Sequence, residues 1–291
     1  MRIMDAWREV GDGVFVRRHE IADLNIGLVV GEESCLVIDT RMSHRQGREL
    51  AATIREITSL PWTVANTHGH YDHCFGNAVF LPADIWGHKG CADMLIAHGA
   101  VKKAYFRIRA AEAGDHEFAD DLDEVEIVPP NRTFTGEAVL DLGGRAVRLS
   151  HLGRGHTDND VVMEVPGTGV VFAGDLVEEG APPVFSDSFP LEWPATLEAL
   201  VRLAPERVVP GHGDVVEPGY VTAQAASLAE VARVAREAFT AGREMDDALR
   251  DVPLPEETAR HALARAYRQL RGEPSYDSPE ELGAILGVSL N

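Results

Sequence analysis

The segment between Thr67 and Cys74 reads His-Gly-His-Tyr-Asp-His, so four side chains able to bind a metal ion occur within six residues. Imidazole nitrogens and carboxylate oxygens are the ligands that borderline divalent metals such as Zn²⁺ prefer. The alternative is a surface loop that happens to be rich in histidine, but so dense a grouping is rare by chance. The segment therefore predicts a metal-binding loop whose ligands are His68, His70, Asp72 and His73.

Three further short motifs place a histidine or an aspartate beside glycine, each after a run of apolar residues. They are Gly155-His156-Thr157, Gly174-Asp175-Leu176 and Gly211-His212-Gly213. Taken singly, each has an ordinary explanation, because glycine-rich turns often contain histidine and aspartate often caps a helix. Their occurrence together, each at the end of a predicted strand, favours a site shared with the histidine-rich loop.

The elements that must position these residues are predicted from apolar periodicity and from the Gly and Pro residues that interrupt it. The acidic stretch 114–131 is predicted to be a loop. The predicted strands are 13–19, 25–30, 34–39, 62–66, 78–81, 84–87, 139–142, 147–150, 161–165, 170–173 and 207–209. The predicted helices in this part of the chain are 44–60, 91–113 and 194–203.

The two halves of this region resemble each other. In both 61–69 and 205–213 a Pro follows a helix, a short apolar run comes next, and a His-Gly pair stands near its end. Earlier in each half an apolar strand leads into an aspartate, Asp39 or Asp175. The pattern predicts two β-rich halves packed face to face, with the metal ligands at strand ends along their shared edge.

The sequence changes character from Tyr220 onward. The stretches 221–241 and 256–271 are rich in Ala, Glu and Arg and carry apolar residues at helical spacing, and 280–286 is predicted as one more short helix. We therefore expect a catalytic domain over residues 1–219 and a helical extension over 220–291. The extension is expected to pack on the core or on a second copy of the chain, and a role in shaping a substrate pocket stays open.

Composition narrows the classes of function. The chain has 291 residues, of which 45% are hydrophobic and 25% charged, and its formal net charge is -20. So acidic a protein lacks the basic surface that binding to nucleic acid or to an anionic membrane requires. Its three cysteines form no CxxC pair, and neither a signal peptide nor a long apolar span is evident. We expect a cytoplasmic protein that acts on a small molecule.

These motifs, in this order, resemble the metallo-β-lactamase-fold hydrolase superfamily. The resemblance covers about residues 13–214 and includes Asp39, which matches an early structural aspartate of that superfamily. It implies an α/β (α+β) fold, a four-layer αββα sandwich of two β-sheets flanked by helices. It also implies two metal ions per chain, most often Zn²⁺, with Fe or Mn as alternatives. By that pattern His68, His70 and His156 hold the first ion, Asp72, His73 and His212 hold the second, and Asp175 bridges the two.

The chemistry of such a pair of ions agrees with the resemblance. Two cations about 3.5–4 Å apart lower the pKa of a shared water and polarise a carbonyl or phosphoryl oxygen. Asp72 is placed to orient the attacking water or to protonate the leaving group, so it is the predicted catalytic residue. Aspartate at position 175 matches glyoxalase-II-like, lactonase-like and phosphodiesterase-like branches, whereas dedicated β-lactamases carry Cys or Ser there.

The predicted function is accordingly hydrolysis of a small ester, thioester or lactone by a metal-bound hydroxide. One alternative is a mononuclear-iron enzyme similar to persulfide dioxygenases, which share the fold and part of the ligand set. The other is a metal-binding or interaction protein without catalytic activity. The C-terminal helices are a predicted surface for homo-oligomer formation.

Residues around the metal loop are predicted to contact the substrate. Tyr71 lies inside the loop, Arg154 could offset nearby acidic groups, and three aromatic residues follow the bridging aspartate. These aromatics are Phe185, Phe189 and Trp193. They could form an apolar wall above the metals, and the competing interpretation places them in the core or in an interface.

Overall fold

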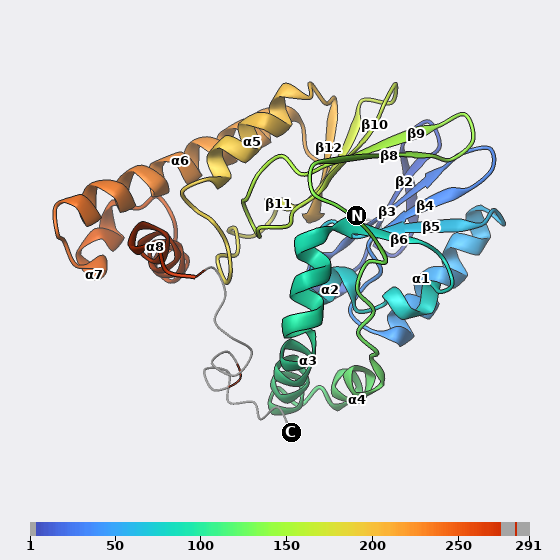
Figure 1. Ribbon diagram of the computed structural model, residues 1–291, viewed down its shortest axis with the longest axis horizontal. Helices are drawn as coiled ribbons and strands as arrows, with labels where there is room; N and C mark the ends of the chain where they lie inside the picture. The colour runs from blue at the N-terminus through green and yellow to red at the C-terminus, as the bar shows by residue number, and fades with distance from the viewer. Residues whose placement is uncertain (1–3, 275–282, 284–291) are drawn as a thin grey trace.

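A computed structural model describes residues 4–274 and Gly283. Two β-sheets face each other and helices cover their outer faces (Figure 1). The sheets hold seven and five strands, in the orders β1-β2-β3-β4-β5-β6-β7 and β12-β11-β10-β9-β8. This arrangement confirms the predicted αββα sandwich.

The first sheet consists of β1 (Trp7–Gly11), β2 (Val14–Arg18), β3 (Asn25–Val30), β4 (Cys35–Ile38), β5 (Trp62–Ala65), β6 (Ile85–His88) and β7 (Arg132–Phe134). The second consists of β8 (Glu137–Asp141), β9 (Ala146–Ser150), β10 (Val162–Val165), β11 (Val170–Glu178) and β12 (Arg207–His212). The helices are α1 (His44–Ile57), α2 (Tyr71–Cys74), α3 (Lys89–Glu112), α4 (His116–Glu124), α5 (Trp193–Arg202), α6 (Pro218–Thr240), α7 (Met245–Ala248) and α8 (Glu256–Arg271). Short 3₁₀ helices occur at η1 (Ile21–Asp23), η2 (Asn77–Phe80) and η3 (Leu249–Asp251).

Side chains of β11 alternate between two apolar clusters, one between the two sheets and one between the second sheet and its helices. Val170 and Phe172 are buried between the two sheets, whereas Val171 belongs to the cluster shared with α5, α6 and α8. Successive side chains of a strand point to opposite faces, so an uninterrupted apolar run is what a strand covered on both sides requires. The outer face of the first sheet packs on α1 through Leu50 and Ile54.

Two local predictions were wrong, two short strands were missed, and one strand was predicted too short. The run 78–81 is not a strand, because residues 77–80 form η2, and an apolar run this short does not distinguish the two by pattern. The stretch 114–131 contains α4, whose Asp115 caps its first turn and whose Leu122 is buried. The short strands β1 and β7 were missed, and β11 extends well past residue 173.

The C-terminal helices pack on the second sheet. Helix α6 lies against α5, and α8 lies against α6 (Figure 1). One continuous apolar cluster joins α6 and α8 to β10, β11 and β12. The division at residue 219 stays a prediction, and the predicted helix 280–286 lies outside the described residues except for Gly283. No helix in the described part of the chain is long and apolar enough to cross a bilayer.

Candidate metal centre

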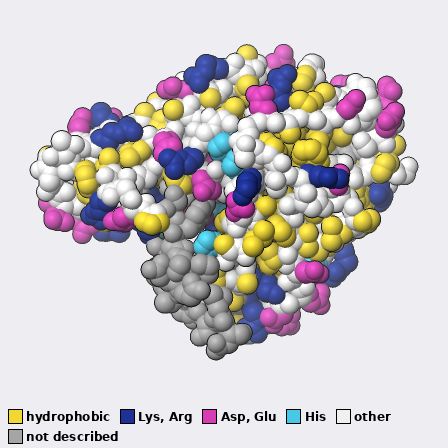
Figure 2. Space-filling view, in the orientation of Figure 1, with side chains coloured by type: hydrophobic (Ala, Val, Ile, Leu, Met, Phe, Trp, Pro, Cys, Tyr) yellow, Lys and Arg dark blue, Asp and Glu magenta, His cyan; other side chains and the backbone are white. Residues whose placement is uncertain are grey.

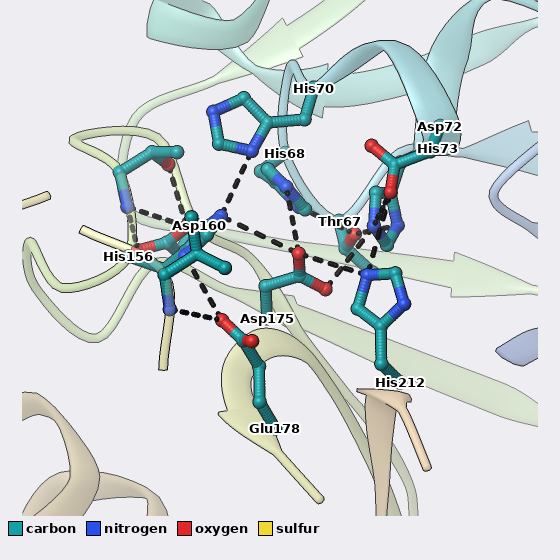
Figure 3. A network of polar contacts seen from close by, with 12 residues as sticks. Thr67, His68, His70, Asp72, His73, His156, Asp160, Asp175, Glu178 and His212 are labelled. Atoms are coloured by element: carbon teal, nitrogen blue, oxygen red, sulfur yellow. Dashed lines mark hydrogen bonds and ion pairs between the residues drawn. The ribbon is translucent and has the colours of Figure 1, made fainter. Parts of the chain in front are cut away.

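Strand ends bring the metal-capable side chains to one edge of the sandwich (Figure 3). The parallel strands β4 and β5 end in register, which places Asp39 next to the loop that carries His68 and His70. The parallel strands β11 and β12 likewise bring Asp175 close to His212. Asp39 and His212 lie at strand ends and Asp175 lies within β11. The other ligands lie in loops or in the short helix α2, which follow strands at the same edge.

The structure brings together all the side chains predicted as ligands, in two groups. Within each group, one ligand atom from every residue lies within 4.8 Å of all the others. The first group is His68, His70, His156 and Asp175. The second group is Asp72, His73 and His212.

Asp175 faces both groups. Its Oδ2 lies 3.6 Å from Nε2 of His68 and 3.5 Å from Nε2 of His156. Its carboxylate also approaches the second group, with Oδ1 3.2 Å from Nε2 of His73 and Oδ2 3.3 Å from Nε2 of His212. A Cβ atom added at Gly211 would lie only 1.7 Å from Oδ1 of Asp175, so the close approach of β12 requires glycine there.

Unsatisfied polar atoms indicate that the residues fit cations. Nε2 of His68, Nε2 of His73 and Oδ1 of Asp175 are buried and have no hydrogen-bond partner among the described residues. Buried polar atoms without partners are costly and rare in folded proteins. Nε2 of both histidines lies close to the Asp175 carboxylate, at 3.6 Å for His68 and 3.2 Å for His73. A set of imidazole and carboxylate ligands suits divalent metals of the zinc type.

Asp39 supports the histidine-rich loop from behind. Its carboxylate accepts hydrogen bonds from the backbone N–H of Thr67 at 2.8 Å and from the Thr67 hydroxyl at 2.7 Å. It also lies 2.8 Å from Nδ1 of His73. A carboxylate on one ring nitrogen fixes the tautomer and leaves the other nitrogen, here the unpartnered Nε2, to bind a metal.

The charges of the site are arranged around Asp175. Burial holds the pKa of His68 well below its ordinary value and lowers the pKa of His156 to about 4, which leaves both rings in the neutral form that binds metals. Burial also opposes protonation of His212, but Asp175 raises its pKa to about 10. Although burial favours the neutral form of Asp175, His73 and His212 hold its pKa well below the ordinary value. The site therefore requires positive charge beside this carboxylate.

A family model described as the metallo-beta-lactamase superfamily matches residues 23–212, more than half of the chain. The chain belongs to the metallo-beta-lactamase superfamily. A beta-lactamase-like protein 2 homolog of Drosophila melanogaster is 29% identical over 157 residues, which are 53% of this chain and 46% of that protein. A metallo-beta-lactamase type 2 of Bacteroides fragilis is 27% identical over 116 residues, which are 38% of this chain and 47% of that protein. The chain thus spans about half the length of these curated relatives.

Solved structures support the fold of this superfamily member. A metallo-beta-lactamase from Pontibacter korlensis gives a TM-score of 0.59 at 19% identity, covering 77% of this chain and 98% of that one. A stereoselective inverting sec-alkylsulfatase from Pseudomonas sp. gives a TM-score of 0.74 at 13% identity, covering 94% of this chain and 51% of that one. The larger coverage in the second case means that the likeness in fold includes part of the C-terminal helices.

A cavity of about 850 Å³ opens beside the metal-binding groups of this metallo-beta-lactamase-fold protein. Asp72, Asp175 and His212 line one side, α3 contributes Lys102 and α8 contributes Arg265. Figure 2 shows histidine side chains near the middle of this face, beside charged side chains of both signs. Helix α8 therefore takes part in forming the pocket.

The residues predicted to contact the substrate divide into two sets. Tyr71 lines the cavity and stacks on Phe106, with ring centroids 3.8 Å apart. Arg154 pairs with Glu192 instead and is not among the described residues that line the cavity. The other three are buried to 2% exposure or less and are likewise absent from that lining: Phe185, Phe189 and Trp193. Their position agrees with the competing interpretation, in which they are core residues.

Two buried carboxyl groups lie beside the metal-binding groups: Glu178 is one of the nearby acidic groups expected from the sequence, whereas Asp187 was not predicted. Asp187 lies 2.9 Å from Nε2 of His70, and Glu178 lies 3.5 Å from Nδ1 of His156. Burial, reinforced by the charge of Asp175, raises the pKa of Glu178 to about 8. Neither residue belongs to a recognisable motif. Asp187 lies in the irregular segment after β11, so only its position in the folded protein marks it.

Proposed function

We propose that this chain is a metal-dependent hydrolase of a small ester, thioester or lactone that binds two divalent cations, most often Zn²⁺. The observation that carries the proposal is the second group, Asp72, His73 and His212, placed beside the first and facing the same carboxylate of Asp175. The first group alone offers enough ligands for one metal ion. The branch, glyoxalase-II-like or lactonase-like, rests on the aspartate at position 175.

Different residues of the site would have different roles in this reaction. When bound, the two cations would activate a shared water and polarise the substrate carbonyl. Asp72 lines the cavity, and its Oδ2 lies 3.5 Å from Nε2 of His212. From there its carboxylate can orient the attacking water, accept the proton that this water loses, and pass the same proton to the leaving group. The apolar surface of Tyr71 and Phe106 excludes water from the acyl or alcohol part of the substrate.

The test is metal analysis of the full chain followed by assays with generic esters, thioesters and lactones, with a penicillin for comparison. We expect two zinc ions per chain and turnover of at least one of the three classes. His212→Ala should abolish turnover, whereas His261→Ala, an exposed histidine on α8, should not.

Either of two results would contradict the proposal and support another function. One iron per chain together with oxygen consumption in the presence of a persulfide would indicate the dioxygenase alternative. Two metals per chain without turnover of any substrate class would indicate a metal-binding protein that is not an enzyme.

A further inference from the structure

Asp187 connects a ligand of the first metal-binding group to a lysine on another helix. Its two carboxylate oxygens lie 2.9 Å and 3.0 Å from Nε2 of His70, and one of them accepts a hydrogen bond from Nζ of Lys102 at 3.0 Å. Asp187 is 8% exposed, and the Lys102 side chain is 16% exposed. Removing one partner of so buried a contact therefore costs more free energy than breaking a surface ion pair.

The contact selects one tautomer of His70. A carboxylate beside Nε2 keeps the proton on that nitrogen, so Nδ1 retains its lone pair. Nδ1 of His70 points toward Nε2 of His156, 2.9 Å away, inside the first group. Asp187 therefore leaves Nδ1 of His70 free of a proton and facing the first group, where it can bind a cation.

The segment that carries Asp187, residues 179–192, has no helix or strand and depends on other elements for its position. Helix α8 supplies two of these contacts. Nε of Arg265 donates to the carbonyl of Ser188 at 3.0 Å, and the side chain of Gln269 accepts from the backbone N–H of Leu191 at 3.2 Å. Ser188 itself is completely buried. The side chain of Asp187 is thus held by Lys102 of α3, and the segment that carries it is held by α8.

We propose that Asp187 is a positioning residue for His70, and that α3 and α8 hold it in place, so that the C-terminal helix contributes to metal binding. Helix α8 lies beyond residues 23–212, where the chain matches its superfamily. The inference rests on the metal-binding part of the proposed function and is independent of the reaction catalysed.

The first experiment measures the affinity of the full chain for Co²⁺ or Zn²⁺ by competition with a chelator, which resolves two binding steps. Asp187→Ala should weaken one step by about 10- to 100-fold and leave the other unchanged. Asp187→Asn, which retains an oxygen acceptor, should weaken the same step less. Lys102→Met should also affect that step alone. Asp121→Ala is the matched control, because Asp121 is equally 8% exposed and accepts from Arg45 outside the cavity.

The second experiment records the nitrogen-15 signals of His70 in the metal-free protein. The wild-type ring should carry its proton on Nε2, and Asp187→Ala should give a mixture of tautomers, while Asp121→Ala should retain the wild-type signal. This readout requires neither metal nor turnover, so it distinguishes a failure of this inference from a failure of the hydrolase proposal. Unchanged tautomer and unchanged affinities in Asp187→Ala would overturn the positioning role.

The third experiment tests the contribution of α8. Gln269→Ala removes the contact with Leu191, and Gln269 is not among the described residues that line the cavity. It should weaken the same binding step, by less than Asp187→Ala does. The control is Arg260→Ala on the same helix, where Arg260 contacts Asp246 and Glu256 at the surface. Equal affinities in the two variants would show that α8 plays no part.

Discussion

Asp175 is the residue on which the two metal-binding groups depend most directly. It is 5% exposed and has imidazoles of both groups within 3.6 Å. Burying a carboxylate is costly unless positive charge compensates it. The flanking residues of β11, by contrast, pack through apolar side chains that do not involve this carboxylate. Function and stability are therefore separable at this position.

Asp175→Ala should lower occupancy of the second metal site and reduce turnover by orders of magnitude, because no carboxylate would remain between the two metal-binding groups. Folding stability should change less, since Val171 and Phe172 keep their packing. The measurements are metal content, turnover of a generic ester and chemical unfolding. A variant that keeps two metals and near-normal turnover would show that the bridging assignment is wrong.

Asp39→Ala should act mainly on stability. The substitution removes an acceptor for Thr67 and His73, and breaking such a buried pair costs about 3–5 kcal/mol. Asp39 also has a φ of 67°, which alanine adopts less readily than asparagine does. Asp39→Asn should consequently lose less, as measured by urea unfolding of both variants. Equal stability of Asp39→Ala and the wild type would contradict a supporting role for this carboxylate.

At the scale of elements, α8 belongs to the core of the second sheet. Leu263 is completely buried within the cluster that also contains strand residues of β10, β11 and β12. A helix that merely touched the surface would show no such residue. The helices after residue 219 should therefore unfold together with the sandwich.

Leu263→Ala should lower the free energy of unfolding by about 2–5 kcal/mol, the usual cost of an emptied core position. Unfolding should remain a single transition, followed in parallel by tryptophan fluorescence and circular dichroism. The control is Leu270→Ala on the same helix, where the side chain is half-buried and the loss should be smaller. Two separate transitions would indicate that the extension folds independently.

For the whole molecule, bound cations should contribute to stability. Any ligand that binds only the folded state raises the free energy of unfolding, by about 4 kcal/mol at a concentration 1,000 times its Kd. Removal of metal by a chelator should therefore lower Tm, and added Zn²⁺ should restore it. The comparison is Asp175→Ala, whose Tm should respond less. Identical Tm values with and without metal would be inconsistent with metal binding at these residues.

Stability should also depend on pH through His19. Burial, followed by the charges of Arg41 and Arg17, lowers its pKa to about 3, and these effects outweigh the carboxylate of Asp5, 3.0 Å from Nδ1. Below a pH of about 6.5 the unfolded chain binds a proton here that the folded protein does not, so stability falls as pH decreases toward 3.

Replacement of this histidine tests the pH effect. His19→Gln should reduce the slope of unfolding free energy against pH by up to about 1.4 kcal/mol per pH unit in that window. His116→Gln, at an exposed position, should leave the slope unchanged. The measurement is urea unfolding at several pH values. A slope identical in all three proteins would exclude His19 as the cause.

Local sequence was sufficient to predict which histidine and aspartate side chains lie together at the candidate site, and most of the strands around it. Ligand chemistry belongs to residue types, and apolar runs such as Asn25–Val30 report burial directly, so these features can be read without the fold. Short edge strands and helix α4 were missed because their residues carry little local signal, and their neighbours in the folded chain decide their conformation.

The roles of Asp187, of Phe189 and of α8 could not be read from the sequence. Asp187 meets His70 across 117 positions of the chain, and α8 reaches the cavity from outside the histidine and aspartate motifs. For Phe189 the sequence left open a place in the substrate pocket or in the core, and the residue is buried. Each of these outcomes depends on which distant segments pack together, because burial and contact are properties of the assembled layers rather than of any short stretch of chain.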